Sequence, residues 1–252
     1  MRSAEELREL VEDALAELTF AGPAGLEEAV RHALDGGGKR IRPVLTLAVG
    51  EALGSEPQEL LPAACAVELV HTFSLVHDDL PALDDDDTRR GRPSTWAQFG
   101  EAVAVLAGDA LLTEAFRLAL SYETPLVARE LADGTLGMIG GQYLDVTESA
   151  ADLASLNRLK TGRLFEASVL VALRVRGSEP QTWGTFAESV GALFQLVDDL
   201  LDGDGFVAAH GVEETRRRAD ESAERALAAL DEIYADTSVL RGLVEGLATR
   251  ST

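Results

Sequence analysis

Apolar residues recur every three or four positions through almost all of the 252-residue chain, which places them on one face of successive helices. No segment shows the strict alternation of a half-buried strand. The breaks between helical segments are short and rich in glycine, so no linker separates one domain from another. The spacing predicts an all-α fold in a single domain over residues 1–252, with helices near 3–20, 26–35, 41–53, 60–80, 97–121, 125–148, 152–159, 162–176, 181–203, 212–232 and 236–249.

Two of the expected helices are apolar on nearly every side, those that contain residues 102–116 and 167–175. A helix of this kind is buried in a core or lines an internal cavity. Hydrophobic residues make up 46% of the chain, which is enough for one large core. The pattern leaves both interpretations open, with core packing as the default.

The chain carries a net charge of −22, which excludes nucleic acids and anionic membrane surfaces as partners unless the basic residues gather in one place. The single cysteine, Cys65, cannot form an internal disulfide, and four scattered histidines argue against a zinc site. The N-terminal segment is acidic and amphipathic, unlike a signal peptide, and no run of 18 apolar residues occurs. We therefore expect a cytoplasmic protein that does not insert into membranes.

An unusual concentration of acid lies at the end of the expected helix at 60–80: six aspartates occupy residues 78–87. Asp78 and Asp84 are six positions apart, roughly 240° around a regular helix, so on such a helix they would face different directions. Pro81 prevents a regular helix from continuing through this segment. A break there could bring Asp84 back beside Asp78.

A second acidic cluster spans residues 198–204, in the sequence DDLLDGD. Asp198 and Asp202 are i and i+4, so their carboxylates share one face of a helix. No basic residue lies between Arg176 and Arg216 to pair with them locally, and apolar residues surround them. Acids on a mostly buried helix require a cation, although a solvated helix end is the other possibility.

Both clusters offer carboxylate oxygens without histidine or cysteine, a donor set that suits a hard cation. Magnesium prefers one or two carboxylates together with the phosphates of a substrate, whereas the ligand spacing of an EF-hand calcium loop is missing. The clusters thus indicate magnesium ions shared by one phosphorylated ligand.

Basic residues gather at three places that suit phosphate groups. Arg89 and Arg90 directly follow the first acidic cluster, and Lys39 and Arg42 lie where a glycine turn meets the expected start of a helix. Backbone amides, the helix dipole and guanidinium groups all favour an anion at such a start. Lys160 begins the third group, KTGR. Together with the acidic clusters, these groups predict a metal-bridged diphosphate site and a second anion site that is poor in metal.

Five motifs in order carry a resemblance to a known family: GGGKRIRP at 36–43, DDLPALDDDDTRRG at 78–91, GGQYLD at 140–145, KTGRLFEAS at 160–168 and FQLVDDLLD at 194–202. Over about residues 25–205 the chain resembles the trans-isoprenyl diphosphate synthases, the short-chain polyprenyl synthetases that include farnesyl and geranylgeranyl diphosphate synthases. The resemblance implies an all-α, isoprenoid synthase-type helical bundle around a deep central cavity. The two aspartate motifs would face each other across the mouth of that cavity.

The resemblance also implies roles for individual residues. It implies that Asp78, Asp84 and Asp198 hold three magnesium ions (Mg2+) against the allylic diphosphate, with Asp79 and Asp202 supporting them. The other site residues group by ligand: Arg89 and Lys160 for the allylic diphosphate, Lys39, Arg42, His71 and Arg90 for isopentenyl diphosphate, and Thr161 and Gln195 beside the developing allylic cation. In this scheme Lys160, Thr161 and Gln195 are the catalytic side chains.

The implied reaction is a magnesium-dependent head-to-tail condensation of isopentenyl diphosphate with an allylic diphosphate, which yields a short-chain all-trans prenyl diphosphate and pyrophosphate. The family is usually homodimeric. Phe73, five residues before Asp78, resembles the aromatic floor that limits chain length in farnesyl-forming enzymes, which favours a C15 product with C20 next. A phenylalanine in the core would fit the same position.

The chain departs from the family pattern after the second aspartate motif. The family continues there through a lysine-bearing loop, but no lysine follows Lys160, so we expect a shortened C-terminal region. Replacement of that loop by Arg216, Arg217 or Arg218 is one possibility. Three alternatives to a synthase stay open: a non-catalytic subunit of a heteromeric prenyl synthase, a class I terpene cyclase, and an acidic helical scaffold. The second motif, DDLLD, argues against a cyclase, and the presence of both motifs argues against a subunit.

Overall fold

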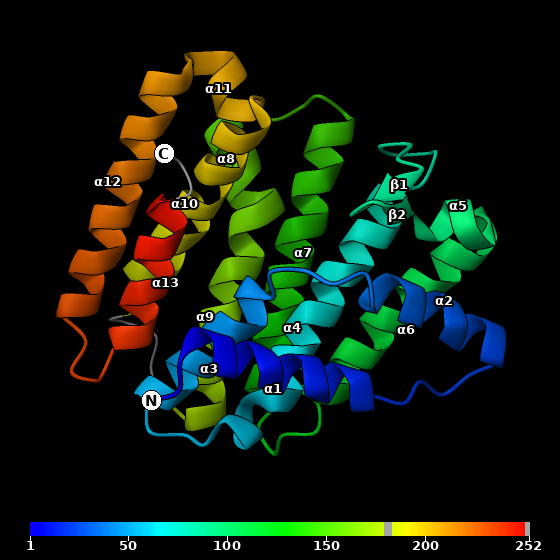
Figure 1. Ribbon diagram of the computed structural model, residues 1–252, viewed down its shortest axis with the longest axis horizontal. Coiled ribbons are helices and arrows are strands. Elements are labelled where there is room, and N and C mark those ends of the chain that lie inside the picture. The colour runs from blue at the N-terminus through cyan, green and yellow to red at the C-terminus, as the bar shows by residue number, and fades with distance from the viewer. Residues whose placement is uncertain (179–182, 250–252) are drawn as a thin grey trace.

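The computed structural model describes residues 1–178 and 183–249, and these residues form a bundle of helices with one two-residue hairpin (Figure 1). The predicted all-α class is therefore confirmed. In chain order the elements are α1 (Ala4–Glu17), α2 (Ala24–Leu34), α3 (Ile41–Ala52), α4 (Pro57–Asp78), β1 (Thr88–Arg89), β2 (Arg92–Pro93), α5 (Thr95–Phe99), α6 (Glu101–Ala119), α7 (Leu126–Val146), α8 (Leu153–Asn157), the π-helix η1 (Arg158–Gly162), α9 (Arg163–Arg176), α10 (Gly184–Asp202), α11 (Gly205–His210), α12 (Val212–Asp231) and α13 (Ser238–Ala248).

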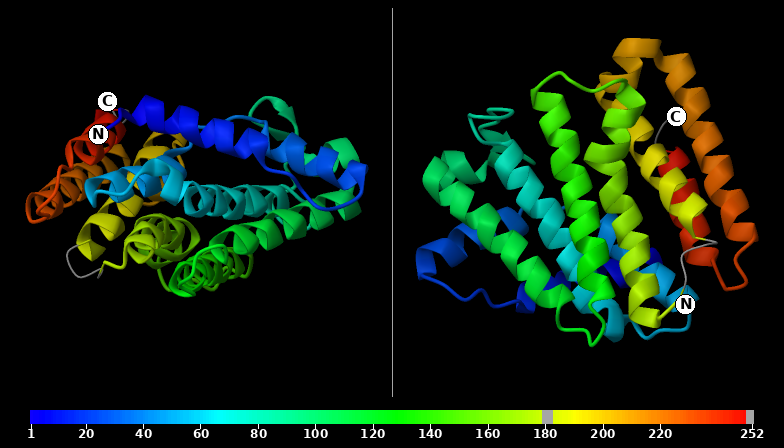
Figure 2. Two further views of the ribbon diagram at one scale, coloured as in Figure 1. Left: turned by 90° about the horizontal axis from the view of Figure 1, so that it is seen from below. Right: turned by 180° about the vertical axis from the view of Figure 1, so that it is seen from behind.

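Helix α4 is the centre of the larger part of the bundle. It packs against α1, α2, α3, α6, α7 and α9, and Figure 2 shows α1 and α2 on one side of it and α7 and α9 on the other. Helices α10, α12 and α13 pack on one another and meet the rest mainly through α9, η1 and α3. By length and composition α4 could cross a membrane, but 67% of its apolar window is buried inside the protein, as in the core helix of a folded domain.

Helix α4 contains a proline, Pro62, which removes one backbone hydrogen bond from the helix. The hydroxyl of Tyr122 enters the backbone ladder at this point: it accepts from Ala63 N at 3.1 Å and donates to Glu59 O at 2.8 Å. Because the tyrosine satisfies both groups, the helix continues past the proline to Asp78. The end of α4 is where the first aspartate motif begins.

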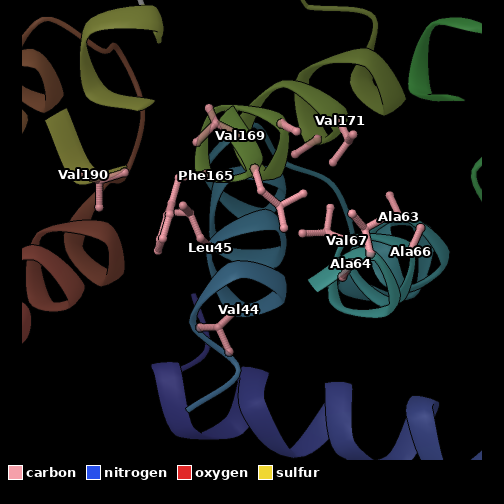
Figure 3. Close-up of a cluster of buried hydrophobic side chains, with 14 of the residues drawn as sticks. Val44, Leu45, Ala63, Ala64, Ala66, Val67, Phe165, Val169, Val171 and Val190 are labelled. Atoms are coloured by element: carbon pink, nitrogen blue, oxygen red, sulfur yellow. The ribbon is translucent and has the colours of Figure 1, made fainter. Parts of the chain in front are cut away.

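The hydrophobic core lies where α3, α4, α9 and α10 meet. Figure 3 shows Leu45 of α3 and Phe165 of α9 opposite Val190 of α10, and all three side chains are buried. Small residues such as Ala63 and Ala64 on α4 let the neighbouring helices approach closely. This packed region fixes α4 and α10, the two helices that carry the aspartate motifs.

The two helices with apolar residues on all sides differ in their surroundings. On α9 most of residues 167–175 are buried, as core packing predicts. On α6, by contrast, Val105 is 39% exposed and Leu106 is 57% exposed. The expectation that residues 102–116 are enclosed on every side is therefore wrong, because one apolar face of α6 lies on the surface of the chain.

Three local predictions are corrected. The helix expected at 97–121 is broken by Gly100 (φ 86°) into α5 and α6, and the short helix α11 forms where none was expected. Between the first aspartate motif and α5 the chain forms the hairpin β1–β2. Its turn residues, Arg90 (φ 53°) and Gly91 (φ 74°), both adopt the left-handed conformation that a two-residue hairpin of type I′ requires.

Candidate active site

The chain turns back on itself directly after α4. Asp84 N donates a hydrogen bond to Asp78 O at 2.9 Å, and further along Asp86 N donates to Asp79 O at 3.1 Å. Pro81 lies within this turn, where a regular helix could not continue. The expected return of Asp84 to the side of Asp78 is therefore observed, and the two residues are joined through the backbone.

The first two aspartates of this motif have different surroundings. The Asp79 carboxylate is buried and accepts a hydrogen bond from Arg89 Nε at 2.9 Å. Burial raises the pKa of Asp79, and the Arg89 guanidinium opposes the rise. Asp78 lines a cavity; burial raises its pKa to about 6, with Lys160 opposing the rise and Asp84 adding to it. Asp78 is thus the member of the pair that can meet a ligand.

The second motif repeats this division on helix α10. Asp198 lines a cavity; burial raises the pKa of its carboxyl, and the charges of Lys39 and Arg42 oppose the rise. Asp199, the next residue, is buried, whereas Asp202 is exposed. In both motifs, then, the first aspartate faces a cavity and the second is enclosed by protein.

Polar side chains connect the second motif to the KTG segment. Thr161 Oγ1 donates to Gln195 Oε1 at 2.6 Å, and Gln195 Nε2 donates to Asp199 Oδ1 at 2.7 Å. The other carboxylate oxygen, Oδ2, accepts from Phe206 N at 2.9 Å in the first turn of α11. Asp199 therefore orients the Gln195 amide, which in turn orients the Thr161 hydroxyl.

The KTG segment itself lies in the π-helix η1, a type of bulge that is frequent at functional sites. Lys160 Nζ lies 2.5 Å from Asp145 Oδ2 on α7. Gly141, one turn before Asp145, allows the two elements to touch, because a Cβ at that position would lie 2.3 Å from Lys160 N. The second glycine of GGQYLD is thus required for the contact between α7 and η1.

A space of about 560 Å³, which we call the basic cavity, is lined by Lys39, Arg42, His71, Arg89, Arg90 and Asp198, among others. Arg42 is buried, and its guanidinium carbon lies 4.4 Å from the centre of the Phe165 ring. Burial lowers the pKa of Arg42 to about 10, so it stays charged, and its Nε forms no hydrogen bond within the described chain. Burial and the charges of Arg42 and Arg90 lower the pKa of His71 well below its usual range, which keeps the imidazole neutral.

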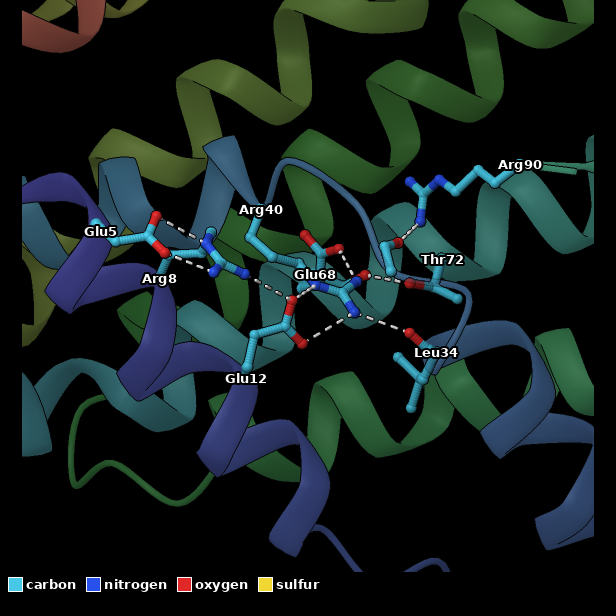
Figure 4. Close-up of polar contacts among 9 residues, drawn as sticks. Glu5, Arg8, Glu12, Leu34, Arg40, Glu68, Thr72 and Arg90 are labelled. Carbon is cyan, nitrogen blue, oxygen red and sulfur yellow. Dashed lines mark hydrogen bonds and ion pairs between the residues drawn. The ribbon is translucent and has the colours of Figure 1, made fainter.

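Arg40 holds the glycine turn that presents these groups. Its backbone is left-handed (φ 46°), and its guanidinium binds Glu12 at 3.0 Å and Glu68 at 2.6 Å, as Figure 4 shows. Burial raises the pKa of Glu68, and Arg40 opposes the rise. Arg40 lines the basic cavity together with Lys39 and Arg42, but its guanidinium is already paired with these carboxylates.

A second space of about 600 Å³, which we call the apolar cavity, is lined by Phe73, His77, Leu112, Met138 and Leu164, together with Asp78 and Lys160. The lining of both cavities includes Arg42, His71, Leu75 and Thr161. The two spaces therefore adjoin. A molecule with an anionic head and a hydrocarbon tail can place each part in a matching environment.

Most of the predicted site residues line these cavities. The basic cavity holds Lys39, Arg42, His71, Arg89, Arg90, Gln195 and Asp198. The apolar cavity holds Phe73, Asp78 and Lys160, and Arg42, His71 and Thr161 line both cavities. Of the predicted residues within the described chain, Asp79, Asp84 and Asp202 line neither cavity: Asp79 is buried, whereas Asp84 and Asp202 are exposed.

The polar residues of the site that were not predicted from the sequence include Glu68, Gln142, Asp145 and Asp199. Gln142 and Asp145 belong to GGQYLD, so the motif was visible, but their partners come from distant parts of the chain. Gln142 lines the apolar cavity, and both polar atoms of its amide are buried without a hydrogen-bond partner in the described chain. An unpaired buried amide is costly unless a ligand satisfies it.

Two of the arginines considered as replacements for the lysine loop are paired with a glutamate on their own helix, α12. Arg217 Nη2 and Arg218 Nε lie 2.6 Å and 2.8 Å from Glu214 Oε1. Both residues line a third cavity of about 310 Å³, which shares Gln195 with the basic cavity. Replacement of the loop by Arg216, Arg217 or Arg218 therefore stays a prediction, and the charges of Arg217 and Arg218 are at present paired with Glu214.

The carboxylates fit a magnesium ion in their chemistry. Asp78 and Asp198 offer oxygen donors, and burial has raised the pKa of each, a cost that a bound cation would relieve. Within residues 1–178 and 183–249, no three Asp, Glu, His or Cys side chains lie close enough to hold a metal by themselves. This arrangement suits magnesium, which usually completes its coordination with water and substrate phosphates.

Comparison with known proteins decides the family. Residues 23–211 match the polyprenyl synthetase family. The chain belongs to the polyprenyl synthetases. It is 41% identical over 220 residues to farnesyl diphosphate synthase of Geobacillus stearothermophilus, a match that spans 79% of this chain and 74% of that protein. It is 44% identical over 217 residues to large subunit 1 of the heterodimeric chloroplastic geranylgeranyl pyrophosphate synthase of Arabidopsis thaliana, spanning 77% and 58% of the two chains.

Solved structures agree with this assignment. This polyprenyl synthetase superposes on geranyltranstransferase from Thermotoga maritima with a TM-score of 0.88, at 31% identity over 98% of each chain. The resemblance inferred from the five motifs is confirmed, and the isoprenoid synthase-type bundle with it. An unrelated acidic scaffold is excluded, and a terpene cyclase finds no support.

Proposed function

We propose that this polyprenyl synthetase catalyses the magnesium-dependent head-to-tail condensation of isopentenyl diphosphate with an allylic diphosphate. The products are pyrophosphate and a short-chain all-trans prenyl diphosphate. The observation that carries the proposal is the junction of the basic and apolar cavities, which share Arg42, His71, Leu75 and Thr161. When both diphosphates lie in the basic cavity and the hydrocarbon chain lies in the apolar cavity, the reacting carbons meet at this junction.

Isopentenyl diphosphate is expected to bind in the basic cavity. Lys39, Arg42 and Arg90 supply positive charge, and the unpaired Nε of Arg42 can donate a hydrogen bond to the diphosphate. The neutral His71 adds a hydrogen bond without further charge. Because the four charged and neutral donors lie on different helices and turns, they can surround the anion.

The allylic diphosphate is expected to lie between Asp78 and Asp198, in contact with Lys160 and Arg89. Magnesium held by Asp78, Asp84 and Asp198, with support from Asp79 and Asp202, would supply positive charge that stabilises the departing diphosphate. Lys160 and Arg89 add donors at the same place, where negative charge grows as the bond breaks.

The reaction proceeds by ionisation and then alkylation. The C1–O bond of the allylic substrate breaks, and its electron pair leaves with the diphosphate. The double bond of isopentenyl diphosphate attacks the resulting cation at C1, and loss of a proton to the departed diphosphate restores a double bond. The Thr161 hydroxyl donates a hydrogen bond to Gln195 Oε1. The lone pairs of the Thr161 oxygen can therefore face the cation. The hydrocarbon lining of the apolar cavity excludes water that would otherwise capture the cation.

We expect farnesyl diphosphate, the C15 product, with C20 as the second possibility. Phe73 is 7% exposed and lines the apolar cavity five residues before Asp78. Phe73 can therefore be both a buried core side chain and the floor of the cavity. Replacement of Phe73 by alanine should deepen the cavity and lengthen the product.

A homodimer is proposed from the surface of α6 and α7. These helices expose a set of large apolar side chains: Leu106, Leu136, Ile139, Tyr143 and Val146. Ile139, Tyr143 and Val146 also line the apolar cavity, so a second copy on this surface would shield the growing chain from water. Light scattering of the wild type and of Leu136→Arg tests this arrangement: a dimer that dissociates in the variant supports it, and a monomeric wild type refutes it.

The test of the reaction is a turnover assay with magnesium, isopentenyl diphosphate and each of dimethylallyl, geranyl and farnesyl diphosphate, with the products sized by chromatography. Farnesyl diphosphate as the final product supports both the reaction and the Phe73 floor. Geranylgeranyl diphosphate keeps the reaction but places the floor deeper than Phe73. Absence of any magnesium-dependent product refutes the proposal for the isolated chain.

The second candidate is a subunit of a heteromeric prenyl synthase. It draws on the expected shortening after α10 and on the name of one relative, which is the large subunit of a heterodimer. Both aspartate motifs are intact, which argues for the complete enzyme. If the isolated chain is inactive, addition of candidate partner chains to the same assay distinguishes a subunit from an inactive protein.

A further inference from the structure

One aromatic contact in the apolar cavity has no part in the proposed reaction. His77 lies four residues after Phe73 on α4, so the two side chains share one face of the helix, and both line the apolar cavity. Their rings meet edge to face, with centroids 4.9 Å apart and planes inclined by 72°. The edge of one ring thus rests on the face of the other at the residue expected to end the cavity.

His77 is itself fixed by helix α6. Its Nε2 lies 3.1 Å from the carbonyl oxygen of Val105, and because a carbonyl can only accept, this nitrogen carries the proton. The imidazole also lies against the bare backbone of Gly108: a Cβ there would come within 2.2 Å of Nε2 and 2.4 Å of Cδ2. A hydrogen bond and a close glycine contact therefore hold the ring from the side of α6.

We propose that His77 is a positioning residue that limits product length by holding the Phe73 ring in place in the apolar cavity. The inference rests on the proposed function, since it concerns the length of the chain that this function builds. Phe73 belongs to α4, whereas Val105 and Gly108 belong to α6. Through His77, the end of the cavity is fixed by two helices rather than by the rotamer of one side chain.

The consequence of losing the imidazole is specific. Without it, the Phe73 ring gains room to turn toward α6, and the cavity can admit a longer hydrocarbon chain. His77 is not part of the lining of the basic cavity within the described chain, so binding of isopentenyl diphosphate and the first condensation should continue. Product length should therefore change more than turnover does.

A matched control exists elsewhere in the chain. The ring of His32 meets Phe99 edge to face at 5.3 Å, and its Nε2 lies 2.8 Å from Pro93 O, the same two kinds of contact that His77 makes. The linings of the basic and apolar cavities, as described, do not include His32. His32→Ala thus removes a histidine with equivalent contacts that lies outside the apolar cavity, so it controls for the product ratio.

The experiment compares wild type, His77→Ala, His77→Phe, Phe73→Ala, the double variant Phe73→Ala/His77→Ala, and His32→Ala. Each is assayed with isopentenyl and geranyl diphosphate, and the ratio of products longer than the main wild-type product to that product is measured. We expect His77→Ala to raise this ratio about fivefold, the size that an aromatic edge contact implies. His77→Phe, which keeps a ring beside Phe73, and His32→Ala should stay near the wild-type ratio.

Non-additivity separates positioning from a general loss of structure. In the Phe73→Ala background, removal of His77 should add nothing, because the ring that it holds is already absent. An unchanged ratio in a folded His77→Ala variant overturns the inference, and so does an equal increase with and without Phe73. If wild type makes no prenyl product, the proposed function fails instead. Urea unfolding of the same four cycle members then still measures the Phe73–His77 coupling, and its absence overturns the positioning role independently.

Discussion

The two aspartate motifs place their first and second aspartates in similar surroundings, but they differ in how firmly hydrogen bonds hold them. In each, the first aspartate (Asp78 or Asp198) faces a cavity and the second is buried. The first motif is closed into a turn by backbone hydrogen bonds from Asp84 and is held by Arg89. The second follows the regular helix α10 to its end, and its last aspartate, Asp202, is exposed. We infer that the turn and Arg89 preorganise the first motif, whereas in the second Asp199 is held by Gln195 and Phe206 N and the exposed Asp202 is fixed by what it binds.

The largest effect is expected at the cavity face of the first motif. Asp78→Asn should lower kcat/KM roughly 10³-fold, because it removes charge where diphosphate and magnesium meet. The same change should stabilise the free enzyme by about 1 kcal/mol: the folded pKa is raised, so ionisation of Asp78 disfavours the folded state as pH rises through about 6, and asparagine does not ionise. Steady-state assays and urea unfolding at pH 7.5 measure both. A variant that is inactive and also less stable would contradict this assignment.

The buried aspartate of the second motif should matter for both stability and rate. Asp199→Ala leaves Phe206 N and the Gln195 amide without their acceptor, which should cost about 2 kcal/mol of unfolding free energy. Because Gln195 then loses its orientation toward Thr161, turnover should also fall. Leu201→Ala, on the exposed side of the same helix, is the control. Equal unfolding curves for wild type and Asp199→Ala would show that the buried carboxylate does not hold the motif.

A smaller effect is expected at the open end of the second motif. Asp202→Asn should lower kcat/KM by about tenfold and leave the stability of the free enzyme unchanged, since the side chain is exposed. The loss should lessen as magnesium is raised, because Asp202 is expected to support binding of the ion. Titration of activity against magnesium checks this. An effect as large as that of Asp78→Asn would remove the proposed asymmetry between the motifs.

The smallest effect is expected at His71, which lines the basic cavity together with Asp198. Its folded pKa lies well below 6.5, so the unfolded chain takes up the proton first and stability is lost as pH falls through 6.5. Relative to His71→Asn, wild type should lose on the order of 1 kcal/mol of unfolding free energy between pH 7.5 and pH 5.5. Urea unfolding at both pH values gives the difference. A pH-independent difference would mean that the imidazole is not enclosed by charge and protein.

The fold was largely predictable because helical periodicity extends through most of the chain. The errors lie where single residues act: Gly100 breaks one expected helix, and the Arg90–Gly91 turn forms a hairpin too short for period-two patterning. The open face of α6 was also missed, because periodicity identifies apolar helices but not what covers them. A helix can be apolar on every side and still present one side to the surface.

The candidate site could be predicted as far as its motifs are local. The return of Asp84 to Asp78 followed from a proline and a spacing. The buried partners could not be predicted in this way, because Glu68 meets Arg40 across 28 positions of sequence and Asp145 meets Lys160 across 15. Such contacts depend on how helices pack, which a single sequence does not state.

The π-helix η1 has a consequence for how this chain can change in length. A π turn contains one residue more than an α turn. Loss of one residue, such as Leu159, would convert the π turn into an α turn, so the side chains of this segment would point in directions different from those they have now. The contacts of Lys160 with Asp145 and of Thr161 with Gln195 could then no longer form together. The extra residue therefore acts as a spacer. A deletion that makes the helix more regular should abolish activity, so the chain cannot be shortened at this bulge without loss of its function.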